Sequence, residues 1–212
     1  MNSRNFQKEL EKLIAQTQKE GKVPSLFLHS CCAPCSSYVL EYLSQYFEIT
    51  VFFYNPNIFP QEEYDKRVKE ITRLIEAMEF VHPVKLVEGH YDPQEFFEMA
   101  KGMEDIPEGG ERCFCCYRQR MEESAKLAAE GGFDYFTTTL SISPLKNAAK
   151  INEIGEELAQ IYHVAHLPSD FKKKNGYKRS IELSHEYDLY RQNYCGCVYS
   201  KRESQEREKN KN

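Results

Sequence analysis

Short apolar segments alternate with amphipathic segments along most of this chain, and the alternation restricts the folds that it can adopt. β-Branched and aromatic residues, as in residues 48–54 (EITVFFY), are typical of buried strands. Strands are expected at residues 25–30, 48–54, 82–87, 133–140 and 162–167. Helices are expected at residues 3–20, 36–46, 61–79, 92–99, 113–130 and 147–162. This order predicts an α/β fold with a doubly wound, mostly parallel sheet.

Composition divides the chain into three parts. Residues 1–24 predict a polar N-terminal helix, residues 25–200 a single α/β catalytic domain with a basic and aromatic C-terminal extension, and residues 201–212 a frayed charged tail. No run of 18 or more apolar residues occurs, and the N-terminus lacks the apolar core of a signal peptide. We therefore expect a cytoplasmic protein with no membrane partner. The net charge of -5 argues against a uniformly basic nucleic-acid coat but allows a local basic patch.

The eight cysteines are the residues that say most about function. Structural disulfides are rare in the reducing cytosol, where clustered thiols more often serve metal or redox chemistry. Cysteines that only fill a core would scatter along the chain. Instead, all eight fall into three groups: Cys31, Cys32 and Cys35; Cys113, Cys115 and Cys116; Cys195 and Cys197.

The fold predicts where the first group lies. It follows directly after the strand expected at residues 25–30, and residues 141–144 (SISP) follow the fourth expected strand. Ligands of doubly wound sheets bind outside the carboxyl ends of the strands, where the strand order reverses. We therefore expect the cysteines to face a ligand cleft at that edge of the sheet.

The first two groups have spacings that suit more than one metal site. Cys32-x-x-Cys35 and Cys113-x-x-Cys116 have the spacing of structural zinc ligands, so zinc is one interpretation. Both groups also contain adjacent cysteines, which reach one small ion poorly but can reach different irons of a larger cluster. An iron–sulfur cluster is the interpretation that this spacing favours.

The third group differs because a glycine separates its thiols. Gly196 permits the unusual backbone of a tight loop. Cys195 and Cys197 can therefore form a strained, redox-active disulfide bond or clamp one metal ion, and a purely structural pair of ligands is the alternative. Asp170 is a further candidate acid or metal ligand, for which a helix cap is the ordinary role.

Residues 171–179 (FKKKNGYKR) combine five basic side chains with two aromatic ones. A run of this kind can hold a phosphate backbone and stack on a base, or it can be a solvated surface loop. The candidate nucleic-acid-binding residues are Lys172, Lys173, Lys174, Tyr177, Lys178 and Arg179.

Five sequence blocks occur between about residues 25 and 200. They are residues 29–35 (HSCCAPC), 112–118 (RCFCCYR), 138–147 (TTLSISPLKN), 170–173 (DFKK) and 190–197 (YRQNYCGC). In this order they resemble the QueH-type epoxyqueuosine reductases. The resemblance implies an α/β fold of the adenine-nucleotide hydrolase-like (HUP-type) class. It also implies reduction of epoxyqueuosine to queuosine at the wobble position of tRNA, the last step of queuosine biosynthesis, without cobalamin.

The same resemblance implies a cofactor and partners. A [4Fe-4S] cluster would be held by Cys31, Cys32, Cys113 and Cys116, and Cys195 and Cys197 would have a redox or metal role. An additional iron ion with an acidic ligand is also implied, and Asp170 is our candidate for that ligand or for the proton donor. The implied partners are tRNA carrying epoxyqueuosine and an electron donor.

Two other functions remain as alternatives. One is an ATP-dependent tRNA-modifying enzyme of the same broad fold, which carries a Ser-Gly-Gly-x-Asp-Ser phosphate loop after its first strand. Residues 30–35 of this chain read SCCAPC, which has no glycine, so their backbone amides are not expected to cradle pyrophosphate in that way. The other is a non-catalytic, zinc-bound tRNA-binding module.

Overall fold

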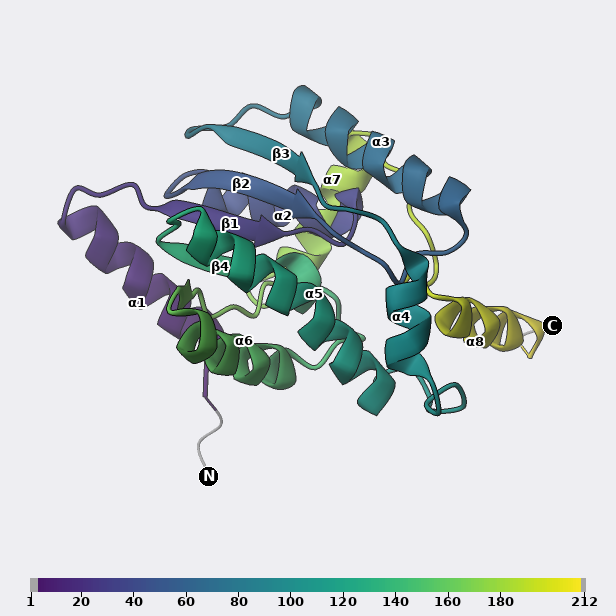
Figure 1. Ribbon diagram of the computed structural model, residues 1–212. Helices are drawn as coiled ribbons and strands as arrows, with labels where there is room; N and C mark the ends of the chain where they lie inside the picture. The colour runs from purple at the N-terminus through teal and green to yellow at the C-terminus, as the bar shows by residue number, and fades with distance from the viewer. Residues whose placement is uncertain (1–3, 211–212) are drawn as a thin grey trace.

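The computed structural model describes residues 4–210, in which strands and helices alternate as expected (Figure 1). The strands are β1 (Ser25–His29), β2 (Glu48–Phe53), β3 (Val84–Glu88), β4 (Tyr135–Thr138) and β5 (Ala165–His166). The α-helices are α1 (Phe6–Lys19), α2 (Ala33–Leu43), α3 (Gln61–Ala77), α4 (Pro93–Ala100), α5 (Glu111–Glu130), α6 (Ala148–Tyr162), α7 (Gly176–Glu186) and α8 (Val198–Lys209). A short 3-10 helix, η1 (Thr139–Ile142), follows β4 directly.

The sheet has the order β3-β2-β1-β4-β5, and every pair of neighbouring strands is parallel. This confirms the doubly wound α/β prediction. The chain builds the sheet outward from β1 to β3 and then returns to place β4 on the other side of β1. The carboxyl ends of β1 and β4 therefore lie side by side at the reversal point, with His29 in register with Thr138.

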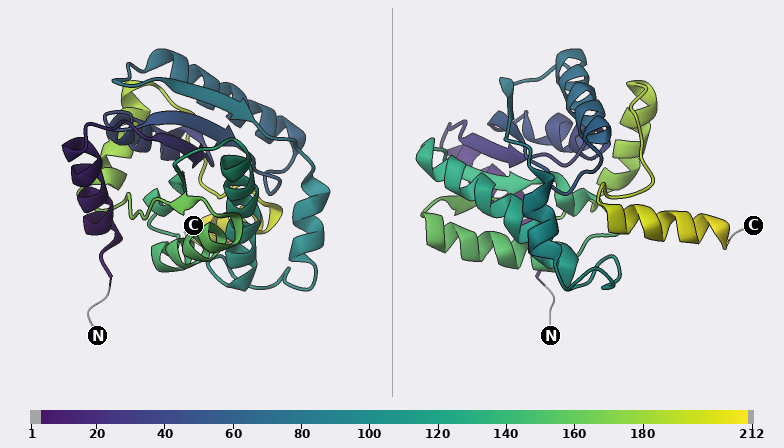
Figure 2. Two further views of the ribbon diagram at one scale, coloured as in Figure 1. Left: turned by 60° about the vertical axis from the view of Figure 1, so that its left-hand side comes forward. Right: turned by 45° about the vertical axis from the view of Figure 1, so that its right-hand side comes forward.

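Alternating side chains divide the core between the two faces of the sheet. On β1, Leu26 and Leu28 face one side and Phe27 faces the other, as the period of a strand requires. Helices α1, α2 and α3 cover the first face, and α7 packs against α2. Helices α5 and α6 cover the second face, and α4 packs against α5 (Figure 2). The two helical layers leave the carboxyl edge of the sheet open to the loops.

Helix α2 begins three residues earlier than the sequence predicts. Cys32 is its N-cap, and Pro34 lies in the first turn, where its missing N–H costs nothing. Helix α5 likewise begins at Glu111 rather than at Cys113. Both early starts matter, because they place cysteines in the first turns of helices, where the helix dipole favours thiolates.

The C-terminal part is more ordered than the sequence analysis expects. Helix α7 begins within the basic stretch, and α8 occupies most of the segment expected to be a frayed tail. Helix α8 is anchored because the Glu203 carboxylate accepts hydrogen bonds from the backbone N–H of Glu108 at 3.0 and 3.1 Å, and because Ser200 and Ser204 are buried. Residues 211–212 of that tail and residues 1–3 lie outside the described part. Within residues 4–210, no helix has the length and apolarity needed to cross a membrane.

Candidate metal centre

The first cysteine group lies where β1 ends. The His29 imidazole at that end is fully buried, with Nδ1 2.8 Å from Thr138 Oγ1 and Nε2 3.1 Å from the Tyr54 carbonyl oxygen. Burial and the nearby Arg120 guanidinium lower the pKa of His29 to about 3, so this ring is neutral and structural. The backbone N–H of Cys31 donates to Thr139 Oγ1 at 3.2 Å, which ties the cysteine loop to η1.

Three sulfurs of this group are close enough to share one metal ion. The Sγ atoms of Cys31, Cys32 and Cys35 all lie within 4.8 Å of one another, and the first two are 3.9 Å apart. Hydrogen bonds from Cys31 and Cys35 lower the pKa of Cys32 well below its usual value, and the positive charge of Arg67 acts in the same direction. Cys32 is thus the member of the group that loses its proton most readily, and the donor set is made entirely of sulfur.

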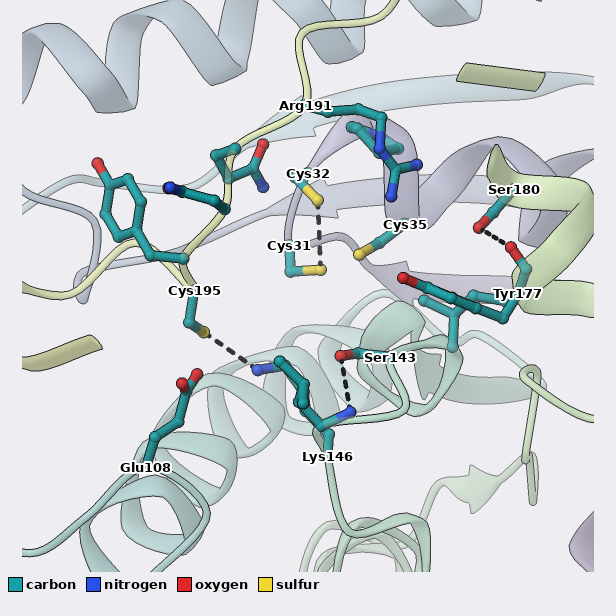
Figure 3. A pocket seen from close by; sticks show the side chains of 16 residues that line it. Cys31, Cys32, Cys35, Glu108, Ser143, Lys146, Tyr177, Ser180, Arg191 and Cys195 are labelled. Carbon is teal, nitrogen blue, oxygen red and sulfur yellow. Dashed lines mark hydrogen bonds between the residues drawn. The ribbon is translucent and has the colours of Figure 1, made fainter. Parts of the chain in front are cut away.

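The main cavity, of about 330 Å³, opens beside these three sulfurs. Figure 3 shows Cys31, Cys32 and Cys35 on one side and Lys146 and Cys195 on another, with Tyr177 and Arg191 among the remaining lining residues. The main cavity therefore combines the carboxyl edge of the sheet with residues of α7 and of the segment before α8. Tyr177 is 37% exposed and has one side toward solvent.

A second, smaller cavity of about 20 Å³ is also lined by thiols. Its cysteines are Cys113 and Cys116, from the first turns of α5, and Cys195 and Cys197, from the loop before α8. Cys195 and Glu108 line both cavities, so the two are adjacent. All eight cysteines are free thiols in the structure. Burial raises the pKa of Cys116 to about 12, so a cation in this cavity is what would hold it as a thiolate.

Lys146 connects the two sides of the main cavity. Its ammonium Nζ donates a hydrogen bond to Cys195 Sγ at 3.1 Å and lies 5.6 Å from the centre of the Tyr117 ring. Burial disfavours the charge, but the electrostatic interaction with Cys195 and Tyr117 raises the pKa of Lys146 well above its usual value. The lysine is therefore a cation at neutral pH.

The loop that carries Cys195 and Cys197 is fixed by a buried arginine. Arg67 of α3 donates from Nη1 to the Cys195 carbonyl oxygen at 3.0 Å and forms an ion pair with Glu63 at 2.7 Å. Gly196 has a φ of 128°, and a Cβ there would lie 2.9 Å from Ile58 and 3.1 Å from Arg67. Both the backbone conformation and the close approach of Arg67 therefore require glycine between the two thiols.

A family model described as "Epoxyqueuosine reductase QueH" matches residues 26–203. This chain belongs to the QueH family. The epoxyqueuosine reductase QueH of Staphylococcus epidermidis is 47% identical over 200 residues, which cover 92% of this chain and 84% of the relative. That of Streptococcus pyogenes is 44% identical over 198 residues, which cover 92% and 78%. The QueH protein of Thermotoga maritima is 35% identical over 189 residues, which cover 86% and 93%.

Membership of the QueH family confirms the resemblance carried by the five sequence blocks, and four of these blocks contribute lining residues to the two cavities. The remaining block, residues 170–173, contributes no lining residue to either cavity. Asp170 is buried and paired with Lys172. The carboxylate that does line both cavities is Glu108.

The structure groups the predicted cysteines in a particular way. Cys31 and Cys32 lie with Cys35 at the main cavity, whereas Cys113 and Cys116 lie with the third group at the second cavity. Cys115 lines neither cavity, and its Sγ is 4.0 Å from the Glu111 carboxylate.

Most of the basic run already has carboxylate partners within the chain. Lys172 pairs with Asp170, Lys174 with Glu11 at 2.6 Å and Arg179 with Glu41 at 2.6 Å. Lys173 is exposed and has no ion-pair partner among residues 4–210, and Lys178 is 3.9 Å from Glu182. Tyr177 is the member of the run that reaches the main cavity.

The sequence analysis did not assign roles to several charged residues at the centre. Lys146 follows the fourth strand, so its position at the carboxyl edge of the sheet was a signal that could have identified it. Arg67, Glu108 and Arg120 give no such signal, because long-range packing alone brings them to the thiols.

Proposed function

We propose that this chain reduces epoxyqueuosine to queuosine at the wobble position of tRNA, with a [4Fe-4S] cluster and without cobalamin. The observation that carries the proposal is a pair of adjacent cavities lined by every cysteine but Cys115, in a chain of the QueH family. An epoxide that becomes an alkene takes up two electrons and two protons and releases its oxygen as water. The centre must therefore deliver electrons as well as bind the substrate.

The donor set fits an iron–sulfur cluster. We assign the four cluster ligands to Cys31, Cys32, Cys113 and Cys116, which border the two adjacent cavities. Every side chain in this set is a thiol, which is the ligand type that iron–sulfur clusters take. When bound, the cluster would supply one electron at a time. Two buried guanidinium groups, of Arg67 and Arg120, supply positive charge beside this sulfur-rich site.

The second electron requires another group, and we assign Cys195 and Cys197 to it. As a dithiol the pair stores two electrons, and as thiolates it can hold an additional iron ion. Arg67 and Gly196 hold the loop of this pair, and Lys146 donates its hydrogen bond to Cys195 from inside the main cavity.

The main cavity and its rim are the proposed place of the modified base. The partly exposed ring of Tyr177 can stack on a base, as aromatic side chains do in single-stranded RNA recognition. Lys173 and Lys178 are exposed residues of the same segment, and their ammonium groups would contact tRNA phosphates. The guanidinium of Arg191 lines the cavity itself and can bind a phosphate bidentately.

Anaerobic purification of the wild-type chain and of two cysteine variants tests the cofactor. Wild type should contain iron and sulfide and absorb broadly near roughly 400 nm, as iron–sulfur proteins do. It should also convert epoxyqueuosine-containing tRNA when a low-potential one-electron reductant is supplied. Cys113→Ser should lose iron and sulfide, whereas Cys115→Ser, the matched control outside both cavities, should keep them. A colourless, inactive protein that contains zinc would favour the zinc-bound tRNA-binding module instead.

The third group is tested separately with Cys195→Ser and Cys197→Ser. Each should abolish turnover and leave sulfide content and tRNA binding intact. Loss of about one iron per chain would assign the pair to a metal ion, and an unchanged iron content would assign it to dithiol chemistry. Full turnover in both variants would contradict any catalytic part for this pair.

A further inference from the structure

Three arginines are among the largest fully buried side chains of the protein: Arg67, Arg112 and Arg120. A buried guanidinium stays charged, so each needs a negative partner. Arg67 pairs with Glu63 at 2.7 Å, and Arg112 lies 3.4 Å from Glu203. Arg120 has no carboxylate partner among residues 4–210, although it is only 1% exposed.

The hydrogen bonds of Arg120 leave one nitrogen unused. Its Nε donates to the Cys116 carbonyl oxygen and its Nη1 to Asn55 Oδ1, both at 3.2 Å. Its Nη2 is buried without a hydrogen-bond partner in the described part of the chain. Arg120 also lines the second cavity together with Cys113 and Cys116.

A buried guanidinium without a negative partner would destabilise the folded protein if no anionic group bound beside it. Burial opposes the charge of Arg120, and the sulfur atoms of Cys116, Cys195 and Cys31 are the groups whose deprotonation would favour that charge. Its positive charge also contributes to the low pKa of His29. The groups beside Arg120 that can balance its charge, once they are deprotonated, are therefore the cysteine sulfurs of the second cavity.

We infer that Arg120 is the electrostatic partner of the metal–sulfur centre and raises its reduction potential. This rests on the cluster proposed above, whose thiolate ligands give it a net negative charge that grows on reduction. A fixed cation beside such a centre stabilises the reduced state more than the oxidised state. Arg120 thereby makes the cluster easier to reduce, without contacting the substrate.

A purely structural role makes a different prediction. If Arg120 only ties α5 to Asn55, its loss would weaken folding but leave the potential of any bound cluster unchanged. Arg120→Gln removes the charge and keeps hydrogen-bonding capacity, whereas Arg120→Lys keeps the charge and loses the planar fork. Arg118→Gln is the matched control, because Arg118 lies on the same helix and pairs at the surface with Glu157.

The test is an anaerobic redox titration of each holoprotein followed by electron paramagnetic resonance, with iron and sulfide analysis. Arg120→Gln should make reduction at least tenfold less favourable, a fall of 59 mV for a one-electron couple, with full iron content. Arg120→Lys and Arg118→Gln should stay close to wild type. An unchanged potential in a fully loaded Arg120→Gln protein would overturn the inference.

A second variant keeps the test decisive if Arg120→Gln does not fold or load. Asn55→Asp retains Arg120 and places a carboxylate 3.2 Å from Nη1, which neutralises the same charge. Its potential should also fall, and an unchanged potential would count against the role of Arg120. Wild-type protein with neither iron nor sulfide would overturn the cluster itself, which is a different result from a loaded variant with an unshifted potential.

Discussion

Charged side chains line the sulfur-rich cavities, and Lys146 is the one that donates a hydrogen bond to a cysteine of the main cavity. It is held in place by its hydrogen bond to Cys195 and by the Tyr117 ring. Its pKa is raised well above the usual value, so it donates this bond as a cation. Hydrogen bonds to a charged group contribute about 1.5–3 kcal/mol, which is enough to fix the position of the thiol during turnover.

Lys146→Met should therefore lower turnover by about 10- to 100-fold, since each 1.4 kcal/mol corresponds to a factor of ten. Iron and sulfide content should not change, because Lys146 is not a proposed ligand. Turnover under single-turnover conditions and metal analysis measure the two effects. Lys150→Met, at a partly exposed position of α6 that pairs with Glu153, is the control and should retain full activity. Wild-type turnover in Lys146→Met would show that the contact is dispensable.

At the scale of elements, helix α7 joins the proposed tRNA surface to the fold. Its first turn carries Tyr177 and Lys178, and Arg179 reaches back to Glu41 of α2. Gly176 begins the helix where a Cβ would meet the Phe171 carbonyl oxygen and the Tyr38 ring, so no side chain fits there. Residues of one short helix thus have two different roles, proposed tRNA binding and attachment to α2, and substitutions can test each role separately.

Lys173→Gln with Lys178→Gln should weaken tRNA binding and flatten its dependence on salt, because exposed ammonium groups release counterions from phosphates. Arg179→Gln should instead lower the free energy of unfolding, by up to about 1 kcal/mol, because it breaks a partly exposed ion pair between α7 and α2. Filter binding at several salt concentrations and urea unfolding measure the two outcomes. Unaltered affinity and salt slope in the lysine variant would mean that these side chains are only solvated.

The sheet could be predicted from the sequence, whereas the C-terminal helices could not. Strands such as β2 consist of β-branched and aromatic residues whose burial is evident from composition, and the chain order then determines the topology. Helix α8 has no continuous apolar face, and it is held by long-range contacts of Glu203 with Glu108 and of Tyr199 with Phe96. Long-range contacts of this kind leave no periodic signal in the sequence.

The same distinction applies to the site. The thiols and their position at the carboxyl edge follow from spacing and strand order. The side-chain partners do not: Arg120 is one arginine among several on α5, and only packing separates it from the surface residue Arg118. Cys35 illustrates the point as well, because the early start of α2 places its sulfur beside Cys31 and Cys32.

At the scale of the whole molecule, two strands of the sheet end in histidines, of which His29 is fully buried and His166 is half-buried with both ring nitrogens hidden from solvent. His29 ends β1, and His166 ends β5, where it packs against the Phe136 ring at 5.3 Å and covers Gly155. Burial lowers the pKa of each to about 3. An unfolded chain binds a proton at each histidine below about pH 6.5, and the native chain does not. Stability is therefore fully present above that pH and is lost as the pH falls toward 3.

The free energy of unfolding should decrease between pH 6.5 and pH 5, with a slope that approaches about 1.4 kcal/mol per pH unit for each histidine. Most carboxylates stay ionised in this window, so the histidines account for the slope. Anaerobic urea titrations of wild type and His166→Gln measure it, and the variant should have the smaller slope. Exposed His185 provides the control, since His185→Gln should keep the wild-type slope. Equal slopes in all three proteins would contradict the assignment.

The two adjacent cavities draw their thiols from distant parts of the chain, from Cys31 to Cys197. A ribosome releases these residues in order, so the first sulfurs emerge long before the loop that closes the site. Until Cys195 and Ser200 have been synthesised, the second cavity lacks two of its lining residues. The proposed metal centre would therefore be completed only after the last of its cysteines has been synthesised.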